Sequence, residues 1–318
     1  MRGLGAAGRL PQPWVAVRNR DERLTFDGRG ARCEWEFTSD LHLARVFPAA
    51  GRRLMRRAFA DWPLERRSEP AVSAAPDVSF VIGHRGRARL PHLLATLASI
   101  AGQRDVAIEC IVVEQSFEPE IAETLPSWVR YLHTPIPSPD FEYSRAWTFN
   151  AGSGEAKGRI LILHDNDMLC PAGYAAEVVA RAREGAAFLD LKRFIFYLDE
   201  AATDRMFANE TLPDDAPQTI VQNAQGGSVA AVRESFFAIG GFDETFVGWG
   251  GEDNEFRERA ETHGRLNGFG YLPFIHLWHP AQSGKLAGRE APAVKRYHEL
   301  AAIPAEERIR RLRASRGT

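Results

Sequence analysis

The chain has 318 residues, 44% of them hydrophobic and 26% charged, which is enough for one large domain or two modest ones with a buried core. This composition excludes a disordered chain, a collagen-like repeat and a small disulfide scaffold. Forty basic and 42 acidic residues leave a formal net charge of -2, which removes the composition argument for nucleic-acid binding.

No stretch of the sequence approaches the roughly 18 consecutive apolar residues of a membrane-spanning helix. The N-terminus also lacks the apolar core of a signal peptide. The cysteines are odd in number and lack paired metal-ligand spacing, which indicates buried small residues in a reducing compartment: Cys33, Cys110 and Cys170. We therefore expect a cytoplasmic protein, at most peripheral to the inner face of a membrane.

Residues 1–75 form a basic N-terminal extension with 14 Arg and 9 acidic residues. Short alternating runs at 14–17 and 33–37 flank Asp27-Gly28 and predict a small β hairpin or meander. Residues 51–59 predict a short basic helix, which is either a patch for an anionic membrane or acidic partner, or an ordinary solvated face. A proline-bounded linker at 68–76 ends the extension.

From residue 77 the pattern alternates between strands and helices. Short apolar runs predict strands at 78–82, 108–113, 159–163 and 187–191. Between the first two, helical spacing predicts one apolar helix face, made of Leu90, Leu93, Leu94, Leu97 and Ile100. Pro171 is expected to open another helix. This alternation predicts an α/β fold with a mostly parallel sheet and helices on both faces.

Ligands of such sheets bind at the carboxyl ends of the strands. Three polar segments are expected to meet at that edge: His84 to Arg87, Glu114 to Ser116, and Asp165 to Asp167. Beyond residue 303, a short segment with Pro and acids at its start and Arg at its end predicts a capped C-terminal helix. The expected organisation is an extension (1–75), a main domain (77–303) and a basic tail (304–318).

Asp165-Asn166-Asp167 follows four apolar residues, so its carboxylates should emerge at a strand end. Two close carboxylates repel unless a cation lies between them. The same pattern also caps turns and helices, and Pro171 favours that alternative.

His276 and His279 are three residues apart, a spacing that puts both imidazoles on one face of a helical turn but not of a strand. Imidazole together with carboxylate oxygen suits Mn, Zn or Fe better than Ca. The alternative is that each histidine is a partly buried residue of the core.

The segment 240–256 (GGFDETFVGWGGEDNEF) is the densest signal in the sequence. Its glycines permit positive φ angles and leave Trp249 on a loop that can cover a ligand. Glu252 and Asp253 then begin an amphipathic helix, whose N-terminus favours an ionised carboxylate, as a general base requires. An ordinary acidic helix cap is the alternative, but it leaves Trp249 unexplained.

Taken in this order, these segments resemble the metal-dependent GT-A (Rossmann-like) glycosyltransferases of family 2 type. The C-terminal half is similar to β-1,4-galactosyltransferases and chondroitin polymerases. The resemblance spans roughly residues 77–285 and is most specific in the Gly-Phe-Asp-Glu…Gly-Trp-Gly-Gly-Glu-Asp run. Two departures are Gly83, where a proline is common, and Asn254, where some relatives have another acid.

The resemblance implies a role for each matching residue. The nucleotide would contact the first two strand ends and the Tyr143–Ala146 segment through His84, Arg85, Arg87, Glu114 and Arg145. The donor would also contact Asp165, Asn166, Gly227, Trp249 and Glu252. Mn²⁺ or Mg²⁺ would be held by Asp167 and His279, with His276 in a position where relatives carry a weaker ligand. Asp253 would be the catalytic base.

The implied reaction is inverting transfer of a hexose or N-acetylhexosamine from a UDP-sugar, with galactose or N-acetylgalactosamine as the first expectation. The acceptor would be a glycan, a lipid-linked glycan or a small molecule, and no nucleic acid is expected. Three alternatives stay open: a metal-dependent hydrolase of a phosphate ester or nucleotide diphosphate, a non-catalytic nucleotide-sugar-binding protein, and a retaining transferase.

Overall fold

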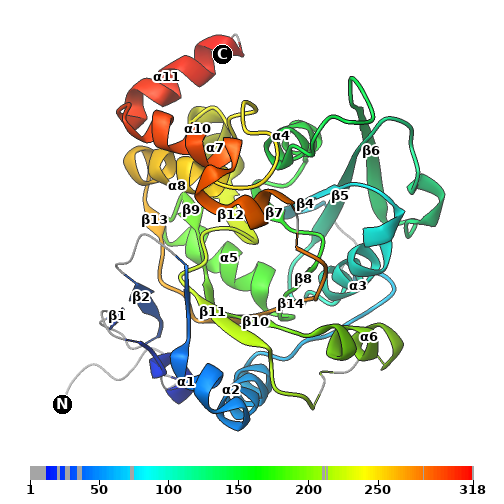
Figure 1. Cartoon of the computed structure of the whole chain (residues 1–318), viewed down its shortest axis with the longest axis vertical. Helices are drawn as coiled ribbons and strands as arrows, with labels where there is room; N and C mark the ends of the chain where they lie inside the picture. The colour runs from blue at the N-terminus through cyan, green and yellow to red at the C-terminus, as the bar shows by residue number, and fades with distance from the viewer. Residues whose placement is uncertain are drawn as a thin grey trace.

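The computed structural model describes residues 12–19, 22–25, 29–33, 38–71, 75–209, 212, 214–281 and 283–316. Within these residues the chain forms a seven-stranded sheet, a five-stranded sheet and a two-stranded hairpin. Figure 1 shows helices packed around the two larger sheets, with α2 and α11 at opposite ends of the molecule.

The seven-stranded sheet has the order β13-β9-β12-β7-β4-β5-β6. Its strands are β4 (Val78–His84), β5 (Ile108–Ser116), β6 (Val129–Pro135), β7 (Ile160–His164), β9 (Phe188–Leu189), β12 (Ser228–Val232) and β13 (Leu266–Asn267). β7, β4, β5 and β6 are mutually parallel, and β12 runs antiparallel to both of its neighbours. The expected mostly parallel α/β sheet is therefore confirmed.

Helices cover both faces of this sheet because successive side chains of a strand point to opposite sides. In β4, Phe80 and Ile82 join a core with α3 (Leu90–Ala101) and α5 (Tyr174–Arg183). Val81 joins a second core, with α4 (Arg145–Glu155), α7 (Arg233–Ala238) and α8 (Glu252–His263). The helix predicted after β4 is confirmed, although Leu94 is 37% exposed. α5 begins three residues later than Pro171 implied.

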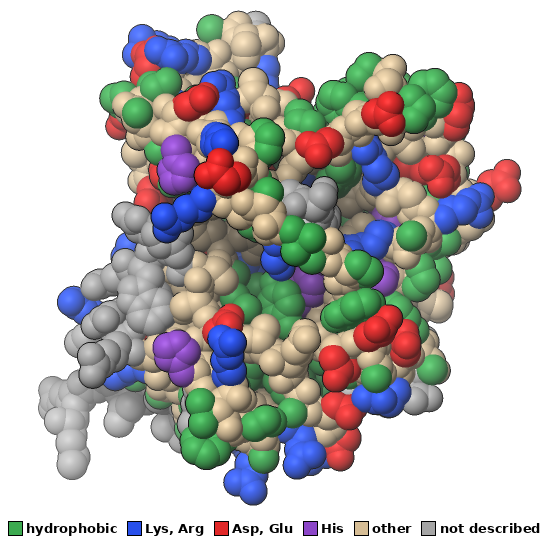
Figure 2. Space-filling model, viewed as in Figure 1, with side chains coloured by type: hydrophobic (Ala, Val, Ile, Leu, Met, Phe, Trp, Pro, Cys, Tyr) green, Lys and Arg blue, Asp and Glu red, His purple; other side chains and the backbone are tan. Residues whose placement is uncertain are grey.

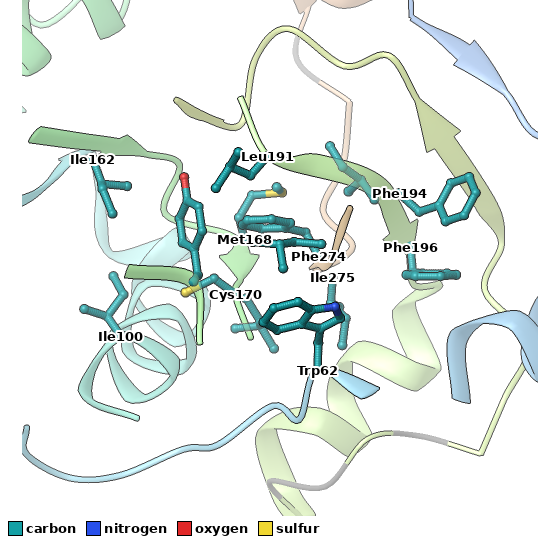
Figure 3. Close-up of a cluster of buried hydrophobic side chains, with 14 of the residues drawn as sticks. Trp62, Ile100, Ile162, Met168, Cys170, Leu191, Phe194, Phe196, Phe274 and Ile275 are labelled. Atoms are coloured by element: carbon teal, nitrogen blue, oxygen red, sulfur yellow. The ribbon is translucent and has the colours of Figure 1, made fainter. Parts of the chain in front are cut away.

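The five-stranded sheet is absent from the sequence prediction. Its order is β3 (Ser39–Asp40), β11 (Thr219–Gln222), β10 (Lys192–Tyr197), β14 (Leu272–His276) and β8 (Met168–Leu169). The predicted strand at 187–191 is reduced to β9, because the chain leaves the first sheet there and enters the second as β10. Figure 3 shows part of the cluster of buried apolar side chains that includes this sheet, among them Met168, Phe194 and Phe274.

The N-terminal elements are η1 (Pro13–Ala16), β1 (Glu22–Leu24), β2 (Ala31–Cys33), α1 (His42–Val46) and α2 (Pro48–Asp61). The predicted basic helix is confirmed as α2, and a hairpin is present as β1 and β2. The strand expected at 14–17 is wrong: residues 13–16 form a 3-10 helix that begins at a proline and buries Trp14 and Val15. Residues 34–37 and the Asp27-Gly28 turn lie outside the described residues.

Buried Arg193 of β10 attaches these N-terminal elements to the five-stranded sheet. Its guanidinium donates to the carbonyls of Val15 at 3.0 Å and Val17 at 2.8 Å. It also donates to Glu22 Oε1 at 2.7 Å, and both side chains of this ion pair are at most 3% exposed. Trp14 packs on Phe194, the next residue of β10.

The remaining elements connect strands or follow the last strand: η2 (Arg87–Arg89), η3 (Ala122–Thr124), α6 (Glu200–Asn209), α9 (Ser283–Ala287), η4 (Gly288–Glu290), α10 (Pro292–Ala301) and α11 (Ala305–Ser315). Of these, α6 connects β10 and β11 of the five-stranded sheet. α11 is the predicted C-terminal helix. Cys110 and Cys170 are buried free thiols, and the side chain of Cys33 lies outside the described residues. Among the described helices, none is long and apolar enough to cross a membrane.

Candidate functional site

Asp167, His276 and His279 converge from distant parts of the chain. Asp167 directly precedes β8, His276 ends β14, and His279 lies in the loop that follows. Their ligand atoms all lie within 4.8 Å of one another. Because β8 and β14 pair antiparallel, strand pairing rather than a helical turn brings the two imidazoles to the carboxylate. In the same region, Figure 2 shows a hollow bordered by histidine and basic side chains.

The His279 ring points its Nε2 toward Asp167. Its Nδ1 lies 2.7 Å from the carbonyl oxygen of Pro280, which can only accept, so Nδ1 donates. In the neutral ring Nε2 is then unprotonated, and it lies 3.3 Å from Asp167 Oδ2. Either a proton on Nε2 or a bound cation can join these two atoms, and a backbone carbonyl on the far ring nitrogen is typical of metal-ligating histidine.

His276 Nε2 lies 3.8 Å from Asp167 Oδ1. Oδ1 is buried and has no hydrogen-bond partner among the described residues. The His276 ring stacks on Tyr197 with centroids 4.1 Å apart. Burial lowers the pKa of His276 to about 4 despite the nearby Asp167 charge, so the ring is neutral at pH 7 and can act as a ligand.

Arg89 is a neighbour of this site that the sequence interpretation missed. Its guanidinium donates to Asp167 Oδ2. Burial alone would raise the pKa of Asp167, but His276, His279 and Arg89 outweigh it and lower that pKa. Arg87, which was expected to contact the nucleotide, is exposed on the same 3-10 helix. The sequence places both arginines in one polar loop but does not indicate which of them turns inward.

Arg145 gathers three of the predicted acidic residues. Its Nε donates to Asp165 Oδ1 at 2.6 Å, and its Nη1 to Asp253 Oδ1 at 2.5 Å, with Glu252 Oε1 at 3.5 Å. Burial would lower the pKa of Arg145, but the three carboxylates raise it. Burial, together with the Asp253 charge, raises the pKa of Glu252 to about 7. The two acids of the Asp-x-Asp motif thus diverge, since Asp165 faces Arg145 and Asp167 faces the histidines.

Asp253 is seated against the backbone of the Gln225–Ser228 segment. A Cβ on Gly226 would lie 2.3 Å from Asp253 Oδ2, so only glycine leaves this space. Gly227 accepts a hydrogen bond from the Asp165 amide at 2.8 Å. This segment, which contains the expected donor contact Gly227, therefore lies between Asp165 and Asp253.

The glycine-rich loop before α8 packs on the residues that lead into α4 and on α10, where Phe246 contacts Ala293 and Leu300. Gly248 donates its N–H to the Tyr143 carbonyl at 2.9 Å, and Ser144 Oγ donates to the Phe246 carbonyl at 2.9 Å. Gly248 and Gly250 have φ angles of 82° and 109°, which favour glycine. Between them, Trp249 is 38% exposed, a large apolar side chain at the surface.

His84 and Asn166 join the ends of β4 and β7. His84 Nε2 donates to the Gly86 carbonyl at 2.9 Å, so in the neutral ring Nδ1 accepts from Asn166 Nδ2, also at 2.9 Å. Burial lowers the pKa of His84 to about 4. Gly83, one of the two departures from the expected pattern, fits here because a Cβ would lie 2.0 Å from the Tyr143 hydroxyl.

Arg85 and Glu114 are occupied by contacts within the protein. Arg85 Nε donates to the Gln115 carbonyl at 2.7 Å, and Nη1 to the Phe141 carbonyl at 2.6 Å. Glu114 accepts from Tyr131 at 2.6 Å and from the backbone N–H of Glu120 at 3.0 Å. In this structure both side chains brace loops at the strand ends.

Comparison with known proteins points to one segment. Residues 215–270 match a family model described as the N-terminal domain of galactosyltransferase. β-1,4-galactosyltransferase 4 of Rattus norvegicus is 50% identical over 38 residues, 12% of this chain and 11% of the relative, and the Cricetulus griseus protein matches equally. The chain thus spans only about a tenth of these relatives' length. The expected resemblance is confirmed for this segment, which contains the glycine-rich loop and the start of α8.

Among solved structures, Staphylococcus aureus TarS (residues 1–349) in complex with UDP gives a TM-score of 0.47 at 12% identity, covering 64% of this chain and 61% of that chain. A second crystal structure of TarS residues 1–349 gives a TM-score of 0.46 at 13% identity, and the match covers 63% of this chain and 60% of that chain.

Proposed function

We propose that this chain, which carries a galactosyltransferase-like segment at residues 215–270, is a glycosyltransferase. Its donor would be a UDP-sugar carrying a hexose or N-acetylhexosamine, with galactose or N-acetylgalactosamine as first candidates. The acceptor would be a hydroxyl of a glycan, a lipid-linked glycan or a small molecule. The observation that carries the proposal is the convergence of Asp167, His276 and His279 beside the Arg145–Asp253 pair.

The donor set suits a divalent cation such as Mn²⁺. Asp167 supplies a buried oxygen without a hydrogen-bond partner among the described residues, and His279 presents Nε2 to this carboxylate while its Nδ1 donates to the Pro280 carbonyl. One carboxylate and two imidazoles favour Mn²⁺, Zn²⁺ or Fe²⁺ over Ca²⁺. When bound, the cation would act as a Lewis acid toward the departing diphosphate.

The chain's own residues supply the other requirements of transfer. Asp253, at the N-terminus of α8, would accept the proton of the acceptor hydroxyl. Attack from the face opposite the leaving diphosphate would invert the anomeric carbon. Arg145 would hold Asp165 and Asp253 at a fixed separation, and exposed Trp249 would offer an apolar face to a sugar ring. Because Arg145 now pairs with Asp253, the acceptor hydroxyl would have to replace part of that contact.

The nucleotide would lie at the carboxyl ends of β4 and β5, as ligands do in such sheets. His84, Asn166 and Glu114 border that edge, and Arg85 and Arg87 lie in the loop after β4. Arg85 and Glu114 would act mainly by bracing this edge, and Arg87 is free to move toward a bound nucleotide because it is exposed.

A thermal-shift panel of nucleotide sugars with and without Mn²⁺ tests the proposal. A bound donor raises the melting temperature in proportion to its affinity, so UDP-galactose or UDP-N-acetylgalactosamine with Mn²⁺ should give the largest shift. D167A should remove the Mn²⁺-dependent part of that shift. No shift with any nucleotide sugar, or full transfer activity in EDTA, would contradict the proposal.

We also propose that α2 contacts an anionic membrane surface. One face of this helix exposes four arginines, Arg52, Arg53, Arg56 and Arg57. Two large apolar side chains directly before the helix are also exposed, Val46 by 67% and Phe47 by 60%. Basic side chains next to exposed apolar ones favour the surface of an anionic bilayer.

A further inference from the structure

We propose that Arg89 exchanges one anion for another during donor binding: it pairs with Asp167 before the cation binds, and with the donor diphosphate afterwards. This inference rests on the proposed function, because it requires the cation site at Asp167. It adds a binding role for a residue outside the expected set of nucleotide contacts.

The first observation is that Arg89 and His279 approach the same carboxylate oxygen. Arg89 donates to Asp167 Oδ2, and His279 Nε2 lies 3.3 Å from that oxygen. Asp167 Oδ1 has no hydrogen-bond partner among the described residues. Arg89 therefore supplies, beside Oδ2, positive charge that a divalent cation held by Asp167 and His279 would otherwise supply.

The second step concerns competition between the two positive charges. The Asp167 side chain is only 7% exposed, so charges around it are weakly screened by water. A divalent cation held by Asp167 and His279 would repel the guanidinium of Arg89 at such short range. The side chain of Arg89 is 23% exposed and can turn outward. Binding of the cation alone therefore costs the Arg89–Asp167 ion pair.

The third step gives the displaced guanidinium a new partner. The diphosphate of a nucleotide sugar brings negative charge to the same cation, and guanidinium matches phosphate oxygens through two parallel hydrogen bonds. Arg89 would thus oppose binding of the bare cation and favour the cation together with the donor. Such coupling is reciprocal, so the donor should raise the affinity for the cation.

The experiment measures binding rather than turnover. Isothermal titration calorimetry with Mn²⁺ alone, and with UDP at saturating Mn²⁺, compares the wild type with R89Q and R89K. R52Q removes an exposed arginine of α2 as the charge-matched control. We expect R89Q to bind Mn²⁺ alone several-fold more tightly and UDP roughly tenfold more weakly, since a bidentate charged contact is lost. R89K should bind Mn²⁺ as the wild type does but UDP more weakly, because an ammonium lacks the planar fork.

Each contrary outcome has its own meaning. Weaker Mn²⁺ binding in R89Q would show that Arg89 only holds Asp167 in place, and would overturn the exchange. Unchanged UDP affinity in both variants would overturn the diphosphate contact. If the wild type binds UDP but no Mn²⁺, the cation site of the proposed function fails together with this inference. If the wild type binds Mn²⁺ as expected, but R89Q and R89K bind both Mn²⁺ and UDP as the wild type does, this inference alone fails. Should R89Q not fold, the UDP affinity of R89K decides.

Discussion

At the scale of single residues, the site depends on how Asp253 is held. Asp253 contacts Arg145 on one side and the backbone at Gly226 on the other. Its helix is anchored further along by Arg259, which is fully buried and donates to Glu255 at 2.7 Å and to the Ile239 carbonyl at 2.7 Å. These contacts restrict the Asp253 carboxylate, which the proposed role as general base requires.

We expect D253N to abolish most of the sugar transfer while UDP still binds. An amide cannot accept the hydroxyl proton, and general-base catalysis typically contributes about 10²–10⁴-fold. The measurement is kcat together with the UDP dissociation constant. A variant that turns over normally but has lost donor affinity would reassign Asp253 to donor binding.

G226A tests the position of that carboxylate without changing its chemistry. The new Cβ would lie 2.3 Å from Asp253 Oδ2, so Asp253 must shift, and a displacement of about 1 Å can cost about 10²-fold in rate. Mn²⁺ binding should not change. G154A is the matched control, because no atom lies within 4 Å of a Cβ at Gly154. Equal transfer rates in the two variants would contradict this placement of Asp253.

At the scale of elements, the pairing of β10 with β14 places Tyr197 and His276 side by side at the candidate cation site. The register of these parallel strands places Tyr197 opposite His276, and the two rings stack there. β10 is held from its other face by the N-terminal elements through Arg193. The N-terminal segment therefore supports the strand that positions Tyr197.

E22A should destabilise the protein by about 3–5 kcal/mol, because removal of one partner leaves a buried charge without compensation. The side chains of Glu22 and Arg193 are 0% and 3% exposed. Urea unfolding followed by far-UV circular dichroism measures the free energy of unfolding. E123A, at an exposed position of η3, is the control. A loss below about 1 kcal/mol, as for a surface pair, would contradict this interpretation.

At the scale of the whole molecule, basic helices lie at two opposite ends: α2 at one and α11 at the other (Figure 1). Both expose arginines, but only α2 is preceded by exposed apolar side chains, Val46 and Phe47. In α11, Glu307 pairs with Arg310 and Arg311. The apolar contribution to membrane binding is therefore specific to the α2 end.

Vesicle sedimentation tests this difference. The wild type should bind vesicles that contain 30% phosphatidylserine, chosen as an anionic surface, and less so as salt is raised. R52E/R53E should weaken binding about tenfold or more, since each basic residue contributes about 1 kcal/mol. R310E/R311E makes the same change in net charge at the α11 end and should have little effect. Equal loss in both variants would indicate only a general charge effect.

Local patterns in the sequence determined much of this protein. Apolar runs and helical spacing suffice for β4, β5, β7, α2, α3 and the start of α8, because the signal lies in neighbouring residues. The glycine-rich segment ahead of Asp253 was also recognised from sequence alone, and the matching family model covers this segment, where the resemblance was most specific. The strand prediction for Trp14–Val17 was wrong because an apolar run of this length fits a strand, whereas a 3-10 helix begins at Pro13.

Only the tertiary structure decided how the site is assembled. The five-stranded sheet depends on pairing between strands far apart in the sequence, such as β8 with β14, and no local period encodes such a partner. That pairing brings Asp167 to His276 and His279. Asp165, two residues earlier, pairs with Arg145 instead. Likewise, Arg89 turns inward while Arg87 stays exposed because of packing around the strand ends, which the order of residues in one loop does not specify.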